Sequence, residues 1–307
     1  MRNTVIDAIT ELAETNDKVS FVTADLGYSV LENFAGKHPE RFYNVGIAEQ
    51  AMMSVAAGMA LSGEIVFVYS IGNFNTLRCM EQIRNDVCYH NANVKIISVG
   101  GGLSYGQLGM SHHATEDIAM MRTLPNMTVL APADPEEARA AALFAVNHDG
   151  PSYIRLARRG EPVLYEKREP MDITKVQTMR PGKRVALLGC GPVSGEVIFA
   201  CEKLRDLGID AGAYSIPCVN PLDAERLAEI AAEAELIVSV EEHQIQGGLG
   251  GAIAEAISSM PHTRLKRLGL PNEFPHIVGS HDYLCDHYGL SAQKIADTVL
   301  NELEFSK

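Results

Sequence analysis

Several features of specialised proteins are missing from this sequence. Tryptophan is absent, and aromatic residues make up only 6% of the 307 residues. The core must therefore be built from aliphatic side chains, as in parallel sheets that helices cover on both faces. The six cysteines include no Cys-x-x-Cys pair, which argues against a zinc ribbon and a thioredoxin-like redox site. We expect reduced, mostly buried thiols.

Positive charge is scarce as well. The chain has 26 Lys and Arg against 39 Asp and Glu, a formal net charge of −13, so it lacks the broad basic surface that nucleic-acid binding requires. It contains no uninterrupted apolar run long enough to span a bilayer, and its N-terminal residues lack the basic-then-apolar pattern of a signal peptide. We expect a cytoplasmic protein with neither a nucleic-acid nor a membrane partner.

The sequence does contain an alternation of short apolar runs with longer helical patterns. Over the N-terminal half, the apolar runs predict strands at 19–24, 64–69, 94–99, 127–131 and 152–156. The alternation resumes after a polar, proline-bearing stretch, with strands predicted at 184–188, 211–215 and 236–240. This pattern predicts an α/β protein with two doubly wound domains, each with a mainly parallel sheet flanked by helices.

The polar stretch sets the predicted domain boundaries. We expect a first domain at 1–165, a linker at 166–182 and a second, smaller domain at 183–307. The clearest helix begins after the N-cap Asp134 and stops at Gly150. Residues 50–61 are apolar almost all round, so we expect a buried helix in the domain centre or at a subunit interface.

Glu49 stands where a short predicted strand meets this apolar helix. Desolvation at such a junction favours the protonated carboxyl, which can donate its proton in a hydrogen bond to a ligand nitrogen. The alternative is a glutamate at a helix start that complements the helix dipole. The residues alone leave both interpretations open.

A glycine-rich segment, 100–113, follows the third predicted strand and ends in His112 and His113. Open α/β sheets bind ligands at the carboxyl ends of their strands, and glycines let the backbone approach a ligand closely. The adjacent histidines could act in acid–base chemistry or hydrogen bonding; the alternative is a loop with two solvated histidines. No ligand spacing typical of a metal site occurs there, and we predict no metal ligand in this chain.

Taken together, these segments resemble the C-terminal half of a transketolase, as found in the split, two-subunit members of that thiamine-diphosphate-dependent family. The resemblance covers nearly the whole chain, and its specificity comes from the order and spacing of the motifs. The matching motifs are Thr23-Ala24-Asp25-Leu26, Gly46-Ile47-Ala48-Glu49-Gln50, Glu81-Gln82-Ile83-Arg84-Asn85, Ser111-His112-His113, Pro125-Asn126-Met127, Pro132-Ala133-Asp134 and Glu241-Glu242-His243.

The resemblance implies a pyrimidine-binding domain followed by the smaller transketolase C-terminal domain, with thiamine diphosphate held between subunits. Glu49 is then expected to bind and activate the aminopyrimidine, for transfer of a two-carbon ketol unit from a ketose to an aldehyde. Phe74 matches the aromatic residue that stacks on the pyrimidine. Asp25 and Ile47 match residues near the cofactor.

The substrate side of the site follows from the same resemblance. His112 matches a catalytic histidine that contacts sugar hydroxyls, and His113 is assigned to the substrate with it. Arg2 and Arg158 match arginines that bind the phosphate of a sugar phosphate, which is how an acidic protein can still attract an anionic substrate. The alternative for each arginine is an ordinary surface residue.

Two departures from the family pattern carry predictions. Typical transketolases have a histidine and an aspartate where this chain has Gly100 and Leu108, so we expect a different sugar specificity. The Gly-Asp-Gly…Asn signature that binds the diphosphate and Mg²⁺ is absent. We therefore expect a partner subunit with the diphosphate domain and the Mg²⁺ ligands, a heterotetramer, and no activity from this chain alone.

Alternatives stay open at this level. The β subunit of a 2-oxoacid dehydrogenase decarboxylase component shares the expected architecture, but it would decarboxylate a 2-oxoacid and pass the acyl group to a lipoyl domain. A 1-deoxyxylulose-phosphate synthase fits less well because it carries its diphosphate domain in the same chain. A non-catalytic assembly subunit is the alternative from a different class.

Overall fold

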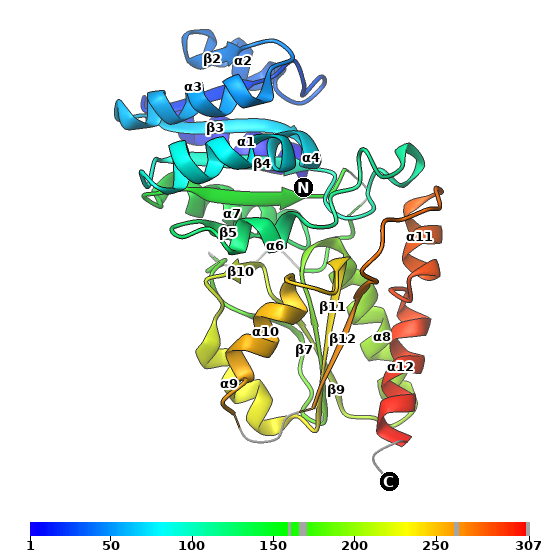
Figure 1. Cartoon of the computed structure of the whole chain (residues 1–307). Helices are drawn as coiled ribbons and strands as arrows, with labels where there is room; N and C mark the ends of the chain where they lie inside the picture. The colour runs from blue at the N-terminus through cyan, green and yellow to red at the C-terminus, as the bar shows by residue number, and fades with distance from the viewer. Residues whose placement is uncertain (159–160, 166–170, 261–263, 305–307) are drawn as a thin grey trace.

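Two sheets, one in each half of the molecule, form its framework. The computed structural model describes residues 1–158, 161–165, 171–260 and 264–304, and residues 166–170 of the predicted linker lie outside the described residues. In Figure 1 the N-terminal half of the chain lies above the C-terminal half, with helices on both faces of each sheet. None of the described helices is long and apolar enough to cross a membrane.

The upper sheet has seven strands in the order β10-β5-β6-β4-β3-β1-β2. All its pairings are parallel except that of β10, which runs antiparallel to β5 and comes from the second half of the chain. Its strands are β1 (Val19–Thr23), β2 (Phe42–Asn44), β3 (Ile65–Ile71), β4 (Val94–Val99), β5 (Thr128–Leu130), β6 (Ser152–Leu156) and β10 (Cys218–Asn220).

The lower sheet has five strands in the order β12-β11-β8-β9-β7, parallel except for β7 against β9. Its strands are β7 (Gln177–Arg180), β8 (Val185–Gly189), β9 (Ala211–Ser215), β11 (Leu236–Gln244) and β12 (Arg264–Leu270). The predicted fold class of two mainly parallel, helix-flanked sheets is confirmed. β7 lies within the segment predicted as linker and forms the edge of this sheet.

Helices cover both sheets, joined in places by single short turns. The α-helices are α1 (Arg2–Ala13), α2 (Glu32–Lys37), α3 (Glu49–Leu61), α4 (Gly72–Asn75), α5 (Met80–Gln82), α6 (Asp117–Arg122), α7 (Pro135–Asn147), α8 (Ser194–Asp206), α9 (Ala224–Glu233), α10 (Leu249–Ile257), α11 (His281–His287) and α12 (Ala292–Glu304). The short turns are η1 (Pro39–Arg41), η2 (Leu77–Cys79), η3 (Ile83–Cys88), η4 (Gly106–Leu108) and η5 (Gly191–Val193).

The local signals explain these elements. Every residue of β1, β4 and β6 is buried, which is why these strands are near-continuous apolar runs rather than alternating ones. α7 begins as predicted, because the Asp134 side chain accepts a hydrogen bond from the Glu137 backbone N–H at 2.9 Å. It ends at Asn147, before the Gly150 that was predicted to stop it.

One buried cation joins the two halves. Arg155 on β6 donates from Nε to Asp117 Oδ2 at 2.7 Å and from Nη2 to the carbonyl oxygens of Ala114 and Glu242, at 3.0 and 2.8 Å. Glu242 belongs to β11 of the lower sheet. Burial alone would raise the pKa of Asp117, but the Arg155 charge outweighs burial and holds that pKa below its usual value.

Replacing Arg155 by Met should lower the free energy of unfolding by about 3–5 kcal/mol, because Asp117 would keep a buried charge without its cation. Urea denaturation followed by circular dichroism measures the change. The matched control is Arg139→Met, which removes a half-exposed ion pair with Glu11 at 2.8 Å and should cost about 0–1 kcal/mol. An Arg155 variant no less stable than the control would contradict the prediction.

Candidate functional site

Glu49 is the first residue of α3, which follows the carboxyl end of β2. Its side chain is only 3% exposed, and its Oε2 accepts a hydrogen bond from Arg78 Nη1 at 2.7 Å. Arg78 comes from the turn η2 and is half exposed. A carboxylate is therefore held at the rim of the upper sheet with a single charged partner on its solvent side.

The same arginine contacts an aromatic ring. The Arg78 Cζ lies 4.7 Å from the centroid of the Phe74 ring, which comes from α4 directly after β3. The His112 ring lies 5.5 Å from Phe74, and the Tyr105 ring lies 5.9 Å from His112. Phe74, His112 and Tyr105 form what we call the aromatic row, which begins beside the Glu49–Arg78 pair.

Two arginines lie at the other end of the aromatic row. The Arg158 Cζ is 5.1 Å from the centroid of the Tyr105 ring. Burial raises the pKa of Tyr105, while the charges of Arg158 and Arg2 act in the opposite direction, so both guanidinium groups lie near its hydroxyl. Within the described part of the chain, the buried Arg2 Nε has no hydrogen-bond acceptor. This end of the row therefore offers positive charge and a free donor to an anion.

The remaining site candidates lie apart from the row. Asp25 has a positive φ of 54° and hydrogen bonds with the Asn44 side chain, and it lines a separate cavity of about 170 Å³. Ile47 is 81% exposed, two residues before Glu49. His113 is buried, its pKa is lowered by burial, and neither ring nitrogen has a partner among the described residues. The loop therefore presents His112 to the site and turns His113 into the protein.

The glycines of the loop make room for the protein's own side chains. Gly100 has a φ of 91°, and a Cβ there would stand 2.1 Å from the Tyr105 ring. At Gly102, with a φ of 64°, a Cβ would stand 2.6 Å from the Cβ of Glu242. Gly100 thus cannot be replaced by a larger residue unless Tyr105 moves, and Leu108 faces outward with 53% exposure.

A larger cavity opens beside Arg158, between the two halves of the molecule. It has a volume of about 610 Å³ and lies where η5 and α8 of the second half face the loop of the first half. Its lining residues are Ser104, Ala157, Arg158, Glu161, Pro162, Pro192, Val193, Gly195, Glu196, Phe199, Glu242, His281, Asp282, Cys285 and Ser291.

Comparison with known proteins assigns both halves of the chain. Residues 1–161 match the pyrimidine-binding domain of transketolase, and residues 174–295 match the transketolase C-terminal domain. The chain belongs to the transketolase family. The resemblance inferred from the motifs is therefore confirmed, and the two matched regions correspond to the two halves of the structure.

Transketolase relatives include single subunits of split enzymes. The chain is 34% identical over 93% of its length to 92% of one subunit of an apulose-4-phosphate transketolase of Actinobacillus succinogenes. It is 34% identical over 96% of its length to 92% of the 6-deoxy-6-sulfo-D-fructose transketolase subunit SqwH of a Clostridium species. A solved structure of a split gene transketolase, described as an inactive β4 tetramer, covers 100% of this chain with 98% of its own, at 35% identity and a TM-score of 0.89.

Arg78 and Tyr105 are the two site residues that the sequence did not reveal. Arg78 follows Phe74 by four residues, a spacing that brings side chains together on a helical turn, and this was the available signal. Its pairing with Glu49 spans 29 positions and depends on how β2 and β3 lie in the sheet. Tyr105 was included in the glycine-rich segment without a role of its own.

Replacing Arg78 by Gln should lower the free energy of unfolding by about 1–3 kcal/mol, because a nearly buried carboxylate loses its charged partner. Thermal unfolding followed by circular dichroism gives the value. The cost should shrink when Glu49→Gln is combined with Arg78→Gln, since a neutral amide needs no cation. Arg84→Gln, an exposed arginine bonded to Asn85 at 2.7 Å, is the control. An equal cost in the presence and absence of Glu49 would show that the pair contributes nothing.

Proposed function

We propose that this chain is the pyrimidine-domain subunit of a split transketolase that depends on thiamine diphosphate. In its reaction a two-carbon ketol unit passes from a ketose, or ketose phosphate, to an aldehyde. The observation that carries the proposal is the buried Glu49 carboxylate, which stands beside the Phe74 ring with one planar group, the Arg78 guanidinium, in contact with both. That pair is an edge and a face for a flat, nitrogen-containing ring.

The residues present fit the aminopyrimidine of thiamine diphosphate. The guanidinium is itself planar and carries N–H donors, so its contacts support a site in which Glu49 and Phe74 accept a group of that shape. When bound, the cofactor supplies the nucleophilic carbon that cleaves a ketose next to its carbonyl. Glu49 then acts as a proton-bearing carboxyl that donates to a ring nitrogen, and Arg78 has to release its Oε2 for this to happen.

The rest of the aromatic row suits a sugar phosphate. His112 is half exposed between Phe74 and Tyr105, where its ring nitrogens can contact sugar hydroxyls and exchange a proton with the substrate. Arg158 and Arg2 at the far end would bind the phosphate. Tyr105, packed over Gly100, fills the place where typical family members carry a histidine, so we expect a sugar other than the usual acceptor.

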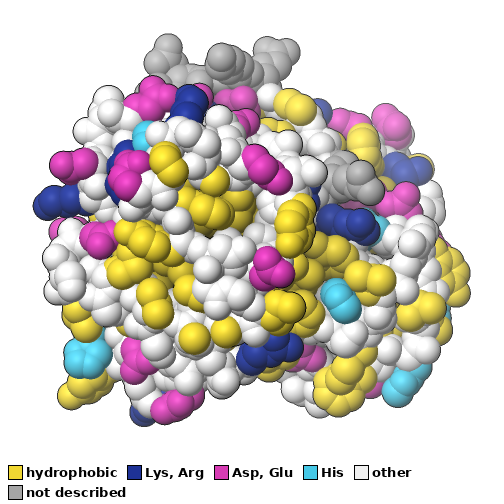
Figure 2. Space-filling model, turned by 90° about the horizontal axis from the view of Figure 1, so that it is seen from above, with side chains coloured by type: hydrophobic (Ala, Val, Ile, Leu, Met, Phe, Trp, Pro, Cys, Tyr) yellow, Lys and Arg dark blue, Asp and Glu magenta, His cyan; other side chains and the backbone are white. Residues whose placement is uncertain are grey.

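A partner subunit has to complete the site. The chain lacks the diphosphate and Mg²⁺ signature, and large apolar side chains are exposed around Glu49: Ile47, Val55, Leu61 and Leu77 are 42–81% exposed. In the view from above, hydrophobic side chains gather on this face (Figure 2). α3, predicted to be covered on all sides, buries one side in the sheet and leaves the other open. We propose that a diphosphate-domain subunit covers it, in a cytoplasmic heterotetramer whose Mg²⁺ ligands lie on that partner.

Glu49→Gln in the assembled two-subunit enzyme should reduce kcat by at least about 100-fold, because the amide cannot transfer the activating proton. The assay measures ketol transfer from ketose phosphates to aldehydes, and size-exclusion chromatography measures assembly. Glu225→Gln, an exposed glutamate of the lower half, is the matched control. Full activity of the Glu49 variant would contradict the assigned role; loss of assembly with no activity in the wild type would favour the assembly-subunit alternative.

Arg158→Gln should raise the KM for a phosphorylated ketose by about 10-fold or more while leaving the KM for the matching free ketose unchanged, because only the phosphate loses a charged partner. Steady-state kinetics with the two ketoses measures the difference. Arg184→Gln, an exposed arginine of the lower half paired with Glu235, is the control. Equal effects on both ketoses would argue that Arg158 does not read the phosphate.

A further inference from the structure

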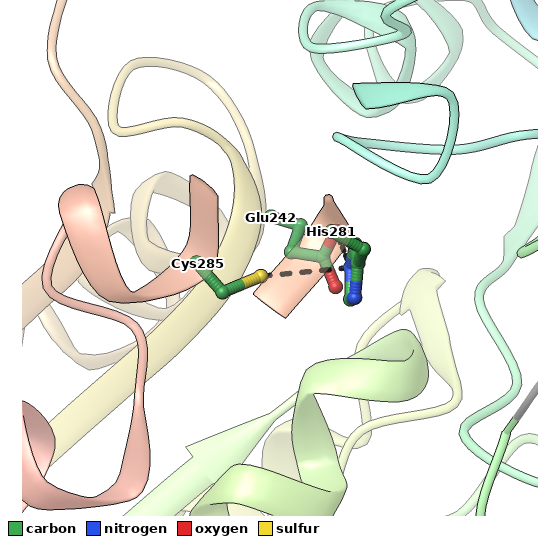
Figure 3. Close-up of side chains that lie close together, drawn as sticks. All are labelled: Glu242, His281 and Cys285. Carbon is green, nitrogen blue, oxygen red and sulfur yellow. Dashed lines mark hydrogen bonds and ion pairs between the residues drawn. The ribbon is translucent and has the colours of Figure 1, made fainter. Parts of the chain in front are cut away.

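Three side chains capable of binding a metal converge at one end of the cavity between the two halves. The Nε2 of His281 lies 2.8 Å from Glu242 Oε2 and 3.5 Å from Cys285 Sγ. The three donor atoms all lie within 4.8 Å of one another. Figure 3 shows the carboxylate, the imidazole and the thiol directed toward a common point. We propose that Glu242, His281 and Cys285 form a binding site for a divalent transition-metal ion, with zinc as the best match.

The local structure explains why these side chains meet. His281 and Cys285 stand four residues apart on α11, a spacing that places both on the same face of a helix. That face is turned toward β11, where Glu242 lies near the end of the strand. The sequence spacing alone predicted no metal ligand, because the third donor comes from a strand 39 positions away.

The donor set decides the kind of metal. One thiolate, one imidazole and one carboxylate are typical zinc ligands, whereas Mg²⁺ and Ca²⁺ prefer oxygen donors alone. Three protein ligands leave the fourth tetrahedral position open, and here that position faces the cavity of about 610 Å³. This site is therefore separate in position and in chemistry from the Mg²⁺ expected on the partner subunit.

The same three residue types could instead form a nucleophilic triad, but the geometry argues against it. In a triad the carboxylate and the nucleophile contact opposite nitrogens of the imidazole. Here Glu242 and Cys285 both contact Nε2. Two groups that converge on one nitrogen can share a metal ion with it, but they cannot relay a proton through the ring.

Surrounding groups orient the proposed ligands. The Leu103 backbone N–H donates to Glu242 Oε2 at 3.3 Å, and the missing side chain at Gly102 lets this loop approach Glu242. The Nδ1 of His281 lies 3.7 Å from an Asp282 carboxylate oxygen, the kind of partner that orients a metal-bound imidazole. Glu242 and Cys285 are 3% and 5% exposed, so both are held in place by the fold.

The charge of the cavity favours a cation. Three further carboxylates, those of Glu161, Glu196 and Asp282, line it together with one arginine, Arg158. The negative lining raises the local concentration of cations near the ligands. Because Glu242 also contacts the loop that carries His112, a bound ion would tie α11, β11 and that loop together, which assigns the ion a structural role next to the substrate end of the site.

Metal binding by the untagged, EDTA-treated full chain tests the proposal without any assay of transketolase activity. Titration with Co²⁺ should saturate at one ion per chain and produce the near-ultraviolet absorption of a cobalt–thiolate bond, and excess Zn²⁺ should abolish that absorption. Elemental analysis after dialysis against Zn²⁺ measures the stoichiometry independently. A wild-type chain that binds neither ion would overturn the proposal.

Matched variants assign the ligands. His281→Gln should weaken Co²⁺ binding by at least about 100-fold, whereas His287→Gln, an exposed histidine on the same helix, should leave it unchanged. Cys285→Ser should abolish the thiolate absorption, whereas Cys201→Ser, a buried thiol on α8, should keep it. Circular dichroism checks that each variant is folded, and Glu242→Gln replaces any that is not. Unaltered binding by a folded His281 or Glu242 variant would exclude the site.

Discussion

The arrangement of the whole molecule depends on the buried guanidinium of Arg155. Every hydrogen bond that it donates must find an acceptor, because an unpaired charge in the core costs several kcal/mol. Its acceptors come from three places: Asp117 at the start of α6, the Ala114 carbonyl at the end of the glycine-rich loop, and the Glu242 carbonyl of the lower sheet. The position of the loop with His112, and the distance between the two sheets, follow from these bonds.

Electrostatics at the site is local rather than global. A chain with a net charge of −13 concentrates positive charge at the two ends of the aromatic row: Arg78 pairs with the buried Glu49, and Arg158 and Arg2 lie around Tyr105. Negative charge collects in the cavity on the other side of Arg158. Anions and cations are therefore attracted to neighbouring but different places, which the overall composition could not indicate.

A split chain leaves a particular mark on its surface. α3 packs Met52 and Met53 into the core and exposes Val55 and Leu61, so its all-round apolar sequence serves two different contacts. Within the fold it covers the upper sheet, and its outer side is suited to a second polypeptide. In the transketolase family such a surface next to the pyrimidine-binding residues is a reason for a chain of this length to work as a subunit.

The sequence by itself determined the elements whose signals are local. Apolar runs predicted the buried strands, the Asp134 cap predicted the start of α7, and the motif order predicted the family and the candidates Glu49 and Phe74. Only the tertiary structure decided the edge strands β7, β10 and β12, which are short or partly exposed and lack an apolar run. It also decided the contacts between distant segments, such as Arg78 with Glu49 and Glu242 with α11. Periodicity records which side of one segment is buried, whereas these contacts depend on how the sheets order segments that are far apart in the chain.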